Sequence, residues 1–582
     1  MKPKRKTIEL FIDGKKVKGF ENQTILEVAL KNNIEIPALC YHSDLKIKGN
    51  CRLCVVEIKG RKGLFPACST LIEPKMEVIT DSKLIRKARR INLELIFAQH
   101  CEECNDCIWS FNCQLLKLAK KYRLNISRFP DRKKEYPVYQ FGPSLIFDSS
   151  KCVDCRNCVE VCEKQGVGFL KIKQKGHLFQ IVPDETKECV YCGQCIVHCP
   201  VGAFEAVGEF EDVEKPLSQK DKIVIFQFAP SIRTSIGEEF GLPYGTVVTG
   251  KLIAGLKKIG ADKVFDVSVG ADFTTFEEAK EFIKRLKQNK HLPMFTSCCP
   301  SWVRFVEVYA PDFVPFLTSV RSPHIILGGL IKTFWAEKQG LDPKKIVVVS
   351  IMPCVAKKYE IQRKELFLNG LKPVDYVLTT RELAYLFLKK GINLKKIKPE
   401  KPDDPLGLPT GAGVIYGASG GVMESALRTA FYFLKVKQKL ERIEFKKVRG
   451  MQGMKQAVID FNGKKIKVAV VNGLGNAKEL LEKIRNKPDL YDYVEVMACF
   501  GGCIGGGGQP VPTDKFIREK RAKALYRIDK GKKIRLAHKN PIVLEVYKKF
   551  FKDKQKVHFI AHTKYFPLKK KKNEQSERVS SK

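Results

Sequence analysis

One cysteine pattern occurs twice in the middle of this 582-residue chain. Residues 152–162 and 189–199 both have the spacing C-x2-C-x2-C-x3-C, and a proline follows the second copy. Spacers of two residues let three thiolates converge on one face of a cubane, while the fourth thiolate reaches across to a second cubane. The duplication therefore predicts two 4Fe-4S clusters. A zinc site is the alternative, and two identical runs of four cysteines argue against it.

This doubled segment resembles a bacterial two-cluster ferredoxin, in which each copy lends its last cysteine to the other cluster. The ligands expected for one cluster are Cys152, Cys155, Cys158 and Cys199, and those expected for the other are Cys189, Cys192, Cys195 and Cys162. The whole chain has 21 cysteines. In a long chain whose basic start is not followed by an apolar leader, such cysteines are typical of metal sites rather than of disulfides.

The N-terminal cysteines follow a strand pattern. Residues 7–20 alternate apolar and polar side chains around Asp13-Gly14, which predicts a β-hairpin, and a helix-like stretch comes next. The cysteines after it are Cys40, Cys51, Cys54 and Cys68. Their spacing resembles that of the 2Fe-2S β-grasp ferredoxins, because the long first spacer suits a loop wrapped round a flat cluster. A zinc ribbon is the alternative.

A second N-terminal group lies in a stretch that is helical by pattern. It contains His100, Cys104, Cys107 and Cys113, with Cys101 left over. This set resembles the 4Fe-4S site with one His and three Cys ligands of the large iron–sulfur subunit of respiratory NADH dehydrogenases and of related hydrogenases. The alternative has four cysteines as ligands and His100 as a bystander. A neutral imidazole in place of an anionic thiolate should make this cluster easier to reduce.

The other five cysteines lie far apart in the sequence but in similar places. Cys298 and Cys299 follow a short apolar run and precede a proline suited to the first turn of a helix. Cys354 follows one buried strand, and Cys499 and Cys503 follow another. Ligands of an open α/β sheet gather at the carboxyl ends of its strands, so these cysteines are expected to converge.

Three motifs around these cysteines name a family. TSCCPSW at 296–302, MPCVAKKYE at 352–360 and MACFGGCIGGGGQP at 497–510 resemble the signature motifs of the FeFe-hydrogenases. With the accessory segments, the resemblance covers nearly the whole chain and is to the long, single-subunit type. Phe500 departs from the proline of many members, and it lies between two ligands without replacing either.

The resemblance implies an H-cluster, which is a 4Fe-4S cubane joined through one cysteine sulfur to a diiron subsite with CO, cyanide and an azadithiolate. Its expected cubane ligands are Cys299, Cys354, Cys499 and Cys503, the last of which bridges to the diiron subsite. Lys357 matches the lysine that donates to one cyanide, and Ser231 matches the position that holds the other. The residues that match the apolar wall are Pro323, Met352 and Met497.

The resemblance also implies a proton path that begins at Cys298, next to a ligand. A free thiol has a pKa near roughly 8.5, so Cys298 is expected to give and accept protons at neutral pH. The further members of the path are Glu278, Thr318 or Ser319, Glu281 and Arg285 at the surface. Glu278 and Glu281 are three residues apart and therefore share one helix face. An ordinary solvated helix face is the alternative.

Net charge and hydropathy limit which partners and which cellular location we expect for this chain. Lys and Arg number 105 against 64 Asp and Glu, a formal net charge of +41. Because this charge is spread without a nucleic-acid-binding motif, we expect an acidic ferredoxin as electron partner and no nucleic acid. No segment approaches the roughly 18 apolar residues of a membrane span, so the prediction is a cytoplasmic chain with no membrane span. Maturation proteins would supply the diiron subsite.

The predicted fold is multidomain α+β and α/β. The expected domains are a 2Fe-2S β-grasp domain at 1–82, a helical 4Fe-4S domain at 83–126, a two-cluster ferredoxin-like domain at 127–208, an H-cluster domain at 209–514, and a small-subunit-like helical segment with a basic tail at 515–582. The predicted cofactors are the H-cluster, three accessory 4Fe-4S clusters and one 2Fe-2S cluster. We expect a monomer, with a hetero-oligomer left open.

The predicted activity is that of a ferredoxin-linked FeFe-hydrogenase, which interconverts protons and electrons with dihydrogen. An electron-transfer subunit like that of NADH dehydrogenase is one alternative, but that family lacks the motifs at 296–302 and 497–510. A sensory hydrogenase of low turnover is a second, and the intact Cys298 and Glu278 argue for catalysis. The third is the iron–sulfur subunit of a bifurcating NAD-linked complex, which would need a separate NADH-oxidising subunit.

Overall fold

The part of the chain described by the computed structural model covers most of the sequence. The described residues are 6–100, 104, 107–109, 112–131, 135–176, 178–434, 445–451, 453–461, 463–568 and 578–579. The leftover Cys101 lies outside them. Among the described residues, no helix is both long enough and apolar enough to cross a membrane.

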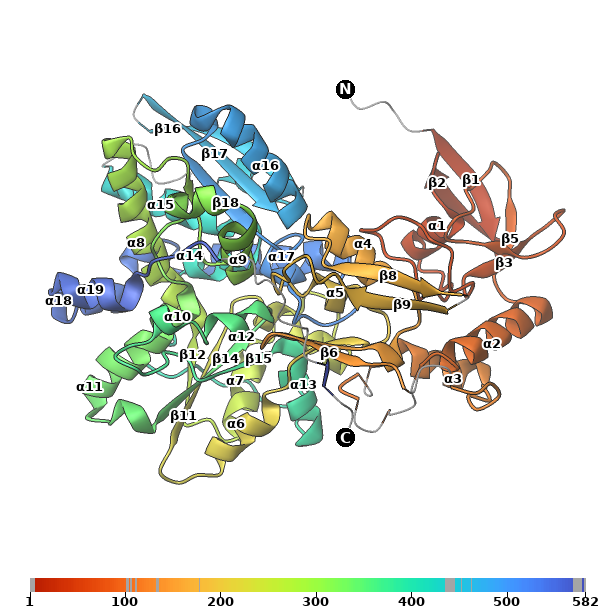
Figure 1. Cartoon of the computed structure of the whole chain (residues 1–582), viewed down its shortest axis with the longest axis horizontal. Helices are drawn as coiled ribbons and strands as arrows, with labels where there is room; N and C mark the ends of the chain where they lie inside the picture. Colours follow the sequence, from red (N-terminus) through yellow and green to blue (C-terminus); the bar gives the residue numbers. More distant parts are fainter. Residues whose placement is uncertain are drawn as a thin grey trace.

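The N-terminal part is a five-stranded sheet with one helix against it, at the right of Figure 1. The strand order is β2-β1-β5-β3-β4. The elements are β1 (Thr7–Ile12), β2 (Lys15–Phe20), α1 (Ile25–Lys31), β3 (Val55–Ile58), β4 (Phe65–Pro66) and β5 (Glu77–Ile79). The predicted hairpin is confirmed: β1 pairs with β2, and Asp13 and Gly14 between them have φ of 49° and 76°, as a type I′ turn requires. Thr24 and Glu27 form a capping box that starts α1.

Two helices, α2 (Lys83–Phe97) and α3 (Gln114–Tyr122), follow and lie beside this sheet. The buried Arg89 of α2 donates hydrogen bonds to the carbonyls of Leu53 and Val55, which fixes the helix against the cysteine-bearing loop before β3. The stretch predicted to be helical is therefore helical on both sides of the His100 group.

The doubled cysteine segment lies between the N-terminal part and the large C-terminal part (Figure 1). Its elements are β6 (Val138–Phe141), β7 (Leu145–Asp148), α4 (Asn157–Lys164), β8 (Leu170–Lys175), β9 (Leu178–Pro183), α5 (Gln194–Val197) and β10 (Phe204–Ala206). The sheet order is β10-β7-β6-β19, where β19 (Arg578–Val579) comes from the end of the chain. Each of the two helices begins inside one copy of the cysteine pattern, and α4 packs on α5.

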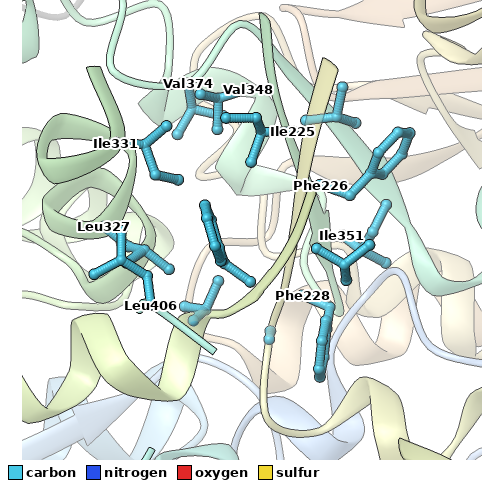
Figure 2. Close-up of a cluster of buried hydrophobic side chains, with 14 of the residues drawn as sticks. Ile225, Phe226, Phe228, Leu327, Ile331, Val348, Ile351, Val374 and Leu406 are labelled. Atoms are coloured by element: carbon cyan, nitrogen blue, oxygen red, sulfur yellow. The ribbon is translucent and has the colours of Figure 1, made fainter. Parts of the chain in front are cut away.

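The large C-terminal part contains two four-stranded sheets. The first is parallel, in the order β12-β11-β14-β15, and consists of β11 (Ile223–Phe228), β12 (Lys263–Asp266), β14 (Ile346–Met352) and β15 (Tyr376–Thr379). Its strands are apolar on both faces because helices cover both. Figure 2 shows part of the resulting core, with Phe226 and Ile351 from the sheet and Leu327 and Ile331 from the neighbouring helical segment.

The second sheet has the order β13-β18-β17-β16 and is parallel except at β16. Its strands are β13 (Met294–Phe295), β16 (Met454–Phe461), β17 (Lys464–Asn472) and β18 (Tyr493–Met497). The helices of the large part are α6 (Phe210–Leu217), α7 (Thr249–Lys258), α8 (Val267–Gln288), α9 (Pro300–Tyr309), α10 (Pro323–Leu330), α11 (Ala336–Gln339), α12 (Ala356–Glu360), α13 (Thr380–Lys389), α14 (Gly411–Val414), α15 (Gly421–Phe433) and α16 (Leu474–Asn486). The long α8 packs on both α10 and α15.

The C-terminal segment adds α17 (Lys515–Gly531), α18 (Pro541–Lys549) and α19 (Lys554–Ala561). Figure 1 shows α17 near the centre of the molecule and α18 and α19 at its far left edge. The backbone after α19 is bound to the chain before α10: Thr563 N–H donates to Ser319 O over 2.8 Å, and Arg321 N–H donates to Ala561 O over 2.7 Å. This segment therefore wraps round the large part rather than forming a separate body.

Candidate metal centre

Four strands from the two sheets end towards one cavity of about 80 Å³. The loops after β11, β13, β14 and β18 supply its walls. The cysteines that line it are Cys298, Cys299, Cys354, Cys499 and Cys503, which are the five that the sequence places at strand ends. The expected convergence is thus what the fold produces, because parallel strands deliver their carboxyl ends to the same edge.

Local sequence sets the position of each thiol. Pro300 occupies the first turn of α9, so the chain turns sharply at Cys299, the residue before the helix. Glycines then let the loop after β18, which bears Cys499 and Cys503, lie against its neighbours. A Cβ on Gly502 would come 2.6 Å from Ser419 N, and a Cβ on Gly506 would come 2.1 Å from Pro353 O. Only glycine allows these approaches.

The electrostatics of the cavity suit a positively charged metal group. Burial raises the pKa of the Cys354 thiol to about 12, and it raises the pKa of Cys299, Cys499 and Cys503 as well. Four thiols that converge in an apolar cavity would be costly to ionise without a compensating cation. Metal coordination deprotonates such thiols outright, so the donor set fits an iron–sulfur group.

One polar atom of the cavity is left without a partner. Ser231 follows β11 and is fully buried, and its Oγ makes no hydrogen bond within the part of the chain that the structure describes. Buried hydroxyls are normally hydrogen-bonded, so an orphaned one on a cavity wall fits a ligand with acceptor atoms. Pro323, Met352 and Met497 also line the cavity, as expected of its apolar wall.

Lys357, on α12, provides the cationic side of the cavity. Its Nζ lies 2.7 Å from Glu360 Oε2 and donates to Cys298 O over 3.1 Å. Burial would lower the pKa of Lys357, but the Glu360 carboxylate outweighs this and raises it. Burial would likewise raise the pKa of Glu360, but Lys357 and His324 lower it to about 2. Lys357 is therefore held as an ammonium at the cavity wall.

Nothing in the sequence singles out His324, which also lines the cavity. Its Nε2 lies 2.6 Å from Glu360 Oε2, and Ser322 Oγ donates to the same oxygen over 3.0 Å. Burial, together with the charge of Lys357, lowers the pKa of His324 to about 4, so the ring is neutral at neutral pH. The signal available was weak: one histidine at the second position of an apolar helix, next to the predicted wall residue Pro323.

The predicted proton path is assembled only in part. Glu278 is buried on α8 and accepts a hydrogen bond from Tyr493 Oη over 2.7 Å. Burial, reinforced by Glu281, raises the pKa of Glu278 to about 8. Among the described residues, no hydrogen bond joins Glu278 to Cys298 or to Glu281. Burial, reinforced by Glu278, raises the pKa of the Cys298 thiol well above its ordinary value. The thiol of Cys298 therefore keeps its proton in this apolar surrounding.

The outer half of the path is continuous. Glu281 Oε2 accepts hydrogen bonds from Thr318 Oγ1 over 2.9 Å and from Ser319 Oγ over 2.8 Å, and Glu281 Oε1 lies 2.5 Å from Arg285. The side chain of Arg285 is 13% exposed, so it lies partly buried at the outer end of this path. Its guanidinium also donates to the carbonyl of Leu317 over 2.7 Å, so it is fixed by the fold.

The accessory thiols lie where the sequence predicts groups of ligands. In the N-terminal part, Cys51 N–H donates to Cys40 Sγ over 3.5 Å, and Cys54 and Cys68 interact with each other. His100 is buried, and its Nδ1 lies 2.8 Å from Lys151 O. A carbonyl at Nδ1 fixes the proton there and leaves Nε2 as the electron-pair donor, which is the usual arrangement of a metal-bound imidazole. The donor set thus fits a ligand role for His100.

The doubled segment also touches the wall of the cavity. Cys499 Sγ lies 3.9 Å from Cys192 O. Beside it, a Cβ on Gly193 would come 2.8 Å from Gly507 Cα, so the two backbones meet with no side chain between them. Gly193 has φ of 66° and is the N-cap of α5. The predicted second cluster would therefore lie directly behind a wall of the cavity.

One further cluster of potential ligands escapes sequence reasoning. His42, Asp44 and His198 place one ligand atom each within 4.8 Å of one another. Arg518 donates to both oxygens of Asp44, over 2.7 and 2.8 Å. A guanidinium so placed already neutralises the carboxylate, so we interpret this cluster as an ion-pair network that ties together the N-terminal part, the doubled segment and α17.

The arrangement defines a class of protein: an iron–sulfur oxidoreductase with a buried thiol-lined centre and accessory cysteine groups that lead to it. The family model "Iron only hydrogenase large subunit, C-terminal domain" matches residues 222–507. Three other family models also match: "2Fe-2S iron-sulfur cluster binding domain" at residues 5–83, "4Fe-4S dicluster domain" at residues 151–203, and "Iron hydrogenase small subunit" at residues 515–568. The chain belongs to the iron-only, or FeFe-, hydrogenase family. It is a hydrogenase with 2Fe-2S and 4Fe-4S domains and an H-cluster domain.

Two relatives match along almost their whole length. The NADP-reducing hydrogenase subunit HndD of Solidesulfovibrio fructosivorans is 40% identical over 96% of this chain and 99% of its own. Iron hydrogenase 1 of Clostridium pasteurianum is 39% identical over the same shares. Among solved structures, FeFe-hydrogenase HydA1 from Chlamydomonas reinhardtii, in a variant form, has 37% identity and a TM-score of 0.55, covering 62% of this chain and 99% of that one.

Proposed function

We propose that this hydrogenase reduces protons to dihydrogen reversibly, with electrons taken from or given to an acidic ferredoxin. The observation that carries the proposal is the convergence of Cys299, Cys354, Cys499 and Cys503 on one cavity that also holds the ammonium of Lys357. Those four thiols would hold the cubane of the H-cluster, with Cys503 as the bridge to the diiron subsite. When bound, this group supplies the redox-active irons at which protons and electrons combine.

The chain's own residues would orient and enclose that group. Lys357, which Glu360 keeps protonated, would donate to one cyanide, and the orphaned Ser231 Oγ would donate to the other. The apolar side chains of Pro323, Met352 and Met497 would exclude water from the same space. The group's CO, cyanide and azadithiolate would have to be delivered by maturation proteins.

The accessory groups would form an electron relay. We assign one 2Fe-2S cluster to the N-terminal sheet and three 4Fe-4S clusters to the following segments, one of them held by His100 and three cysteines. The ligands are Cys40, Cys51, Cys54 and Cys68; His100, Cys104, Cys107 and Cys113; and the two crossed sets of the doubled segment. The contact between Cys192 and Cys499 supports entry of electrons to the cavity from the doubled segment.

We further propose that Cys298 is the first proton station and that Glu278, Glu281, Thr318, Ser319 and Arg285 carry protons onward. The short contacts around Glu281 support the outer half of this path. The raised pKa of Glu278, about 8, supports a carboxyl that is poised to give and take protons near neutral pH. The domain ranges, the β-grasp assignment and a cytoplasmic location remain part of the same proposal.

A second candidate is membership of an NAD(P)-linked complex. It is favoured by the relative named as an NADP-reducing hydrogenase subunit, since this chain matches that subunit along its whole length. In that case a separate subunit would oxidise or reduce the nicotinamide, and this chain would be one member of a hetero-oligomer.

An anaerobic hydrogen assay separates the two candidates. The purified chain is given reduced ferredoxin, NADH or NADPH in parallel, each with the same reducing power. We expect hydrogen from reduced ferredoxin alone. Hydrogen from a nicotinamide with no added subunit would contradict the ferredoxin assignment, and activity that needs both ferredoxin and a co-purifying subunit would favour the complex.

A further inference from the structure

The C-terminal segment brings a histidine to the outer half of the proton path. Residue 562 follows α19 and forms an isolated β-bridge with Val320, and Arg321 Nε donates to the carbonyl of His562 over 2.7 Å. Together with the bond from Thr563 to Ser319, these contacts fix the backbone of His562 beside the serine. The position of this imidazole is thus set by main-chain bonds.

Both ring nitrogens of His562 have oxygen partners. Nδ1 lies 2.9 Å from Ser319 Oγ, and Nε2 lies 3.2 Å from Glu277 Oε2. Ser319 has a single hydroxyl proton, and it donates this proton to the Glu281 carboxylate over 2.8 Å. The serine oxygen must therefore accept the Nδ1 proton of His562. The result is an unbroken chain of hydrogen bonds from the imidazole to Glu281.

The two possible ends of this path differ in chemistry. A guanidinium keeps its proton throughout the physiological range, and that of Arg285 is tied to Glu281 and to fixed carbonyls. An imidazole changes charge between about pH 5 and 8 and can therefore exchange protons with water. The side chains of His562 and Arg285 are similarly exposed, 15% and 13%, so the two ends differ in acid–base chemistry and not in access to solvent.

We propose that His562 is the group through which protons pass between solvent and Glu281, with Arg285 as a residue that positions the carboxylate. The proposal rests on the proton path of the proposed function. The imidazolium gives its Nδ1 proton to Ser319 Oγ while Ser319 gives its own proton to Glu281 Oε2. The imidazole is left neutral and takes a proton from solvent, so one proton enters, one leaves and no electron moves.

The surrounding charges favour this role. Burial would raise the pKa of Glu277, but bonds from His562, Lys280 and Tyr547 lower it to about 2, so it faces the imidazole as an anion. The titratable and charged groups packed around His562 are Glu277, Lys280 and Glu281 on α8, Arg321 before α10, Tyr547 on α18, His558 on α19, and Lys564 after it.

The test compares His562→Gln with His558→Gln in the full, matured chain. Hydrogen evolution from a reduced dye is measured from pH 5.5 to 9 and normalised to iron content. We expect His562→Gln to lose about ten-fold or more near pH 7, as is usual for loss of a proton-transfer group, and to recover with added imidazole. His558 is exposed and its ring stacks on that of His562, but it touches neither Ser319 nor Glu281, so its variant should stay within two-fold of the parent.

Glu281→Gln separates failure of this inference from failure of the proposed path. If Glu281→Gln is inactive while His562→Gln keeps its rate and pH profile, protons reach Glu281 another way and the inference is wrong. If Glu281→Gln is itself fully active, the proposed path fails. A loss in His562→Gln that imidazole does not reverse, with an unshifted pH profile, would assign the histidine a structural role only and would also overturn the inference.

Discussion

At the scale of single residues, two cysteines that are adjacent in the sequence are expected to have different roles in the cavity. Cys298 and Cys299 are adjacent and both line it, yet only Cys299 belongs to the expected set of four ligands. Cys298 instead accepts a hydrogen bond from Lys357 at its carbonyl, and burial raises the pKa of its thiol. A protonated thiol held in this way can act first as a donor.

Cys298→Ala should therefore keep its iron and its infrared CO and cyanide bands but lose nearly all turnover, because alanine has no proton to give. Cys298→Asp should retain part of the activity, since burial raises the pKa of a carboxyl towards neutrality. The matched change Cys299→Ala should instead lose iron of the H-cluster. Iron content and infrared spectra are measured beside hydrogen evolution; an iron-poor or fully active Cys298→Ala would refute the relay assignment.

Glu278→Gln should make folding stability less dependent on pH. The pKa of this carboxyl is raised by burial from an ordinary 4.5 to about 8. Between those values the unfolded chain has lost the proton that the folded chain keeps, so stability that is present below about pH 4.5 falls as the pH rises towards 8. Glutamine is neutral throughout and can still accept the hydrogen bond from Tyr493.

The measurement is the unfolding midpoint of the parent and the variant at pH 5 and pH 8. The parent should lose more stability across this interval than the variant does, whereas the exposed Glu479→Gln should behave as the parent. If Glu278→Gln and the parent lost the same stability between pH 5 and pH 8, the Glu278 carboxyl would not be the group that makes stability fall with rising pH.

At the scale of elements, the sequence predicts those turns, helix starts and strand ends that depend on residues adjacent in the chain. The hairpin at Asp13-Gly14 and the start of α9 at Pro300 follow from turn and cap chemistry, and the structure confirms both. The ends of β14 and β18 follow from apolar runs that stop before cysteines. These local signals, together with the rule that ligands gather at the carboxyl ends of strands, were enough to predict that the five cavity cysteines converge.

Contacts across long sequence separations could not be predicted in this way. His324 meets Glu360, His42 meets His198, and His562 meets Ser319 only because separate segments pack together. Each histidine is unremarkable in its own stretch of sequence. The partial burial of Arg285 likewise depends on carbonyls at the end of another loop.

Gly506→Ala tests how tightly the loop after β18 is packed. Its Cβ would lie 2.1 Å from the carbonyl oxygen of Pro353, a backbone atom that cannot rotate away. We expect a lower melting temperature and loss of iron from the cavity, because the loops that bear Cys354 and Cys503 would be pushed apart. Gly531→Ala, at the end of α17 where nothing lies within 4 Å, should leave both unchanged. Full iron content in Gly506→Ala would contradict this packing argument.

At the scale of the whole molecule, the pair of helices α18 and α19 and the doubled segment attach to the large part at different places (Figure 1). The first wraps past α10 and reaches α8, and the second contacts the cavity wall at Cys499. Electrons and protons would therefore approach the same centre from separate directions. The formal charge of +41 is the remaining feature at this scale.

We expect that charge to steer an acidic ferredoxin. Raising the salt from 0.1 to 1 M shortens the screening length from about 10 Å to about 3 Å, so the apparent affinity for ferredoxin should fall steeply. Hydrogen evolution from a neutral dye, measured in the same buffers, should change little. Equal salt sensitivity with both donors would rule out steering.

The close approach of Gly193 and Gly507 has a consequence for the rate of electron transfer in the proposed relay. Electron tunnelling falls off exponentially with distance, and this junction holds the doubled segment against the cavity wall with no side chain as a spacer. A methyl group on either glycine would lengthen the gap without altering any thiol. In the proposed relay, the rate at which electrons arrive at the centre would therefore depend on two residues that have no side-chain chemistry of their own.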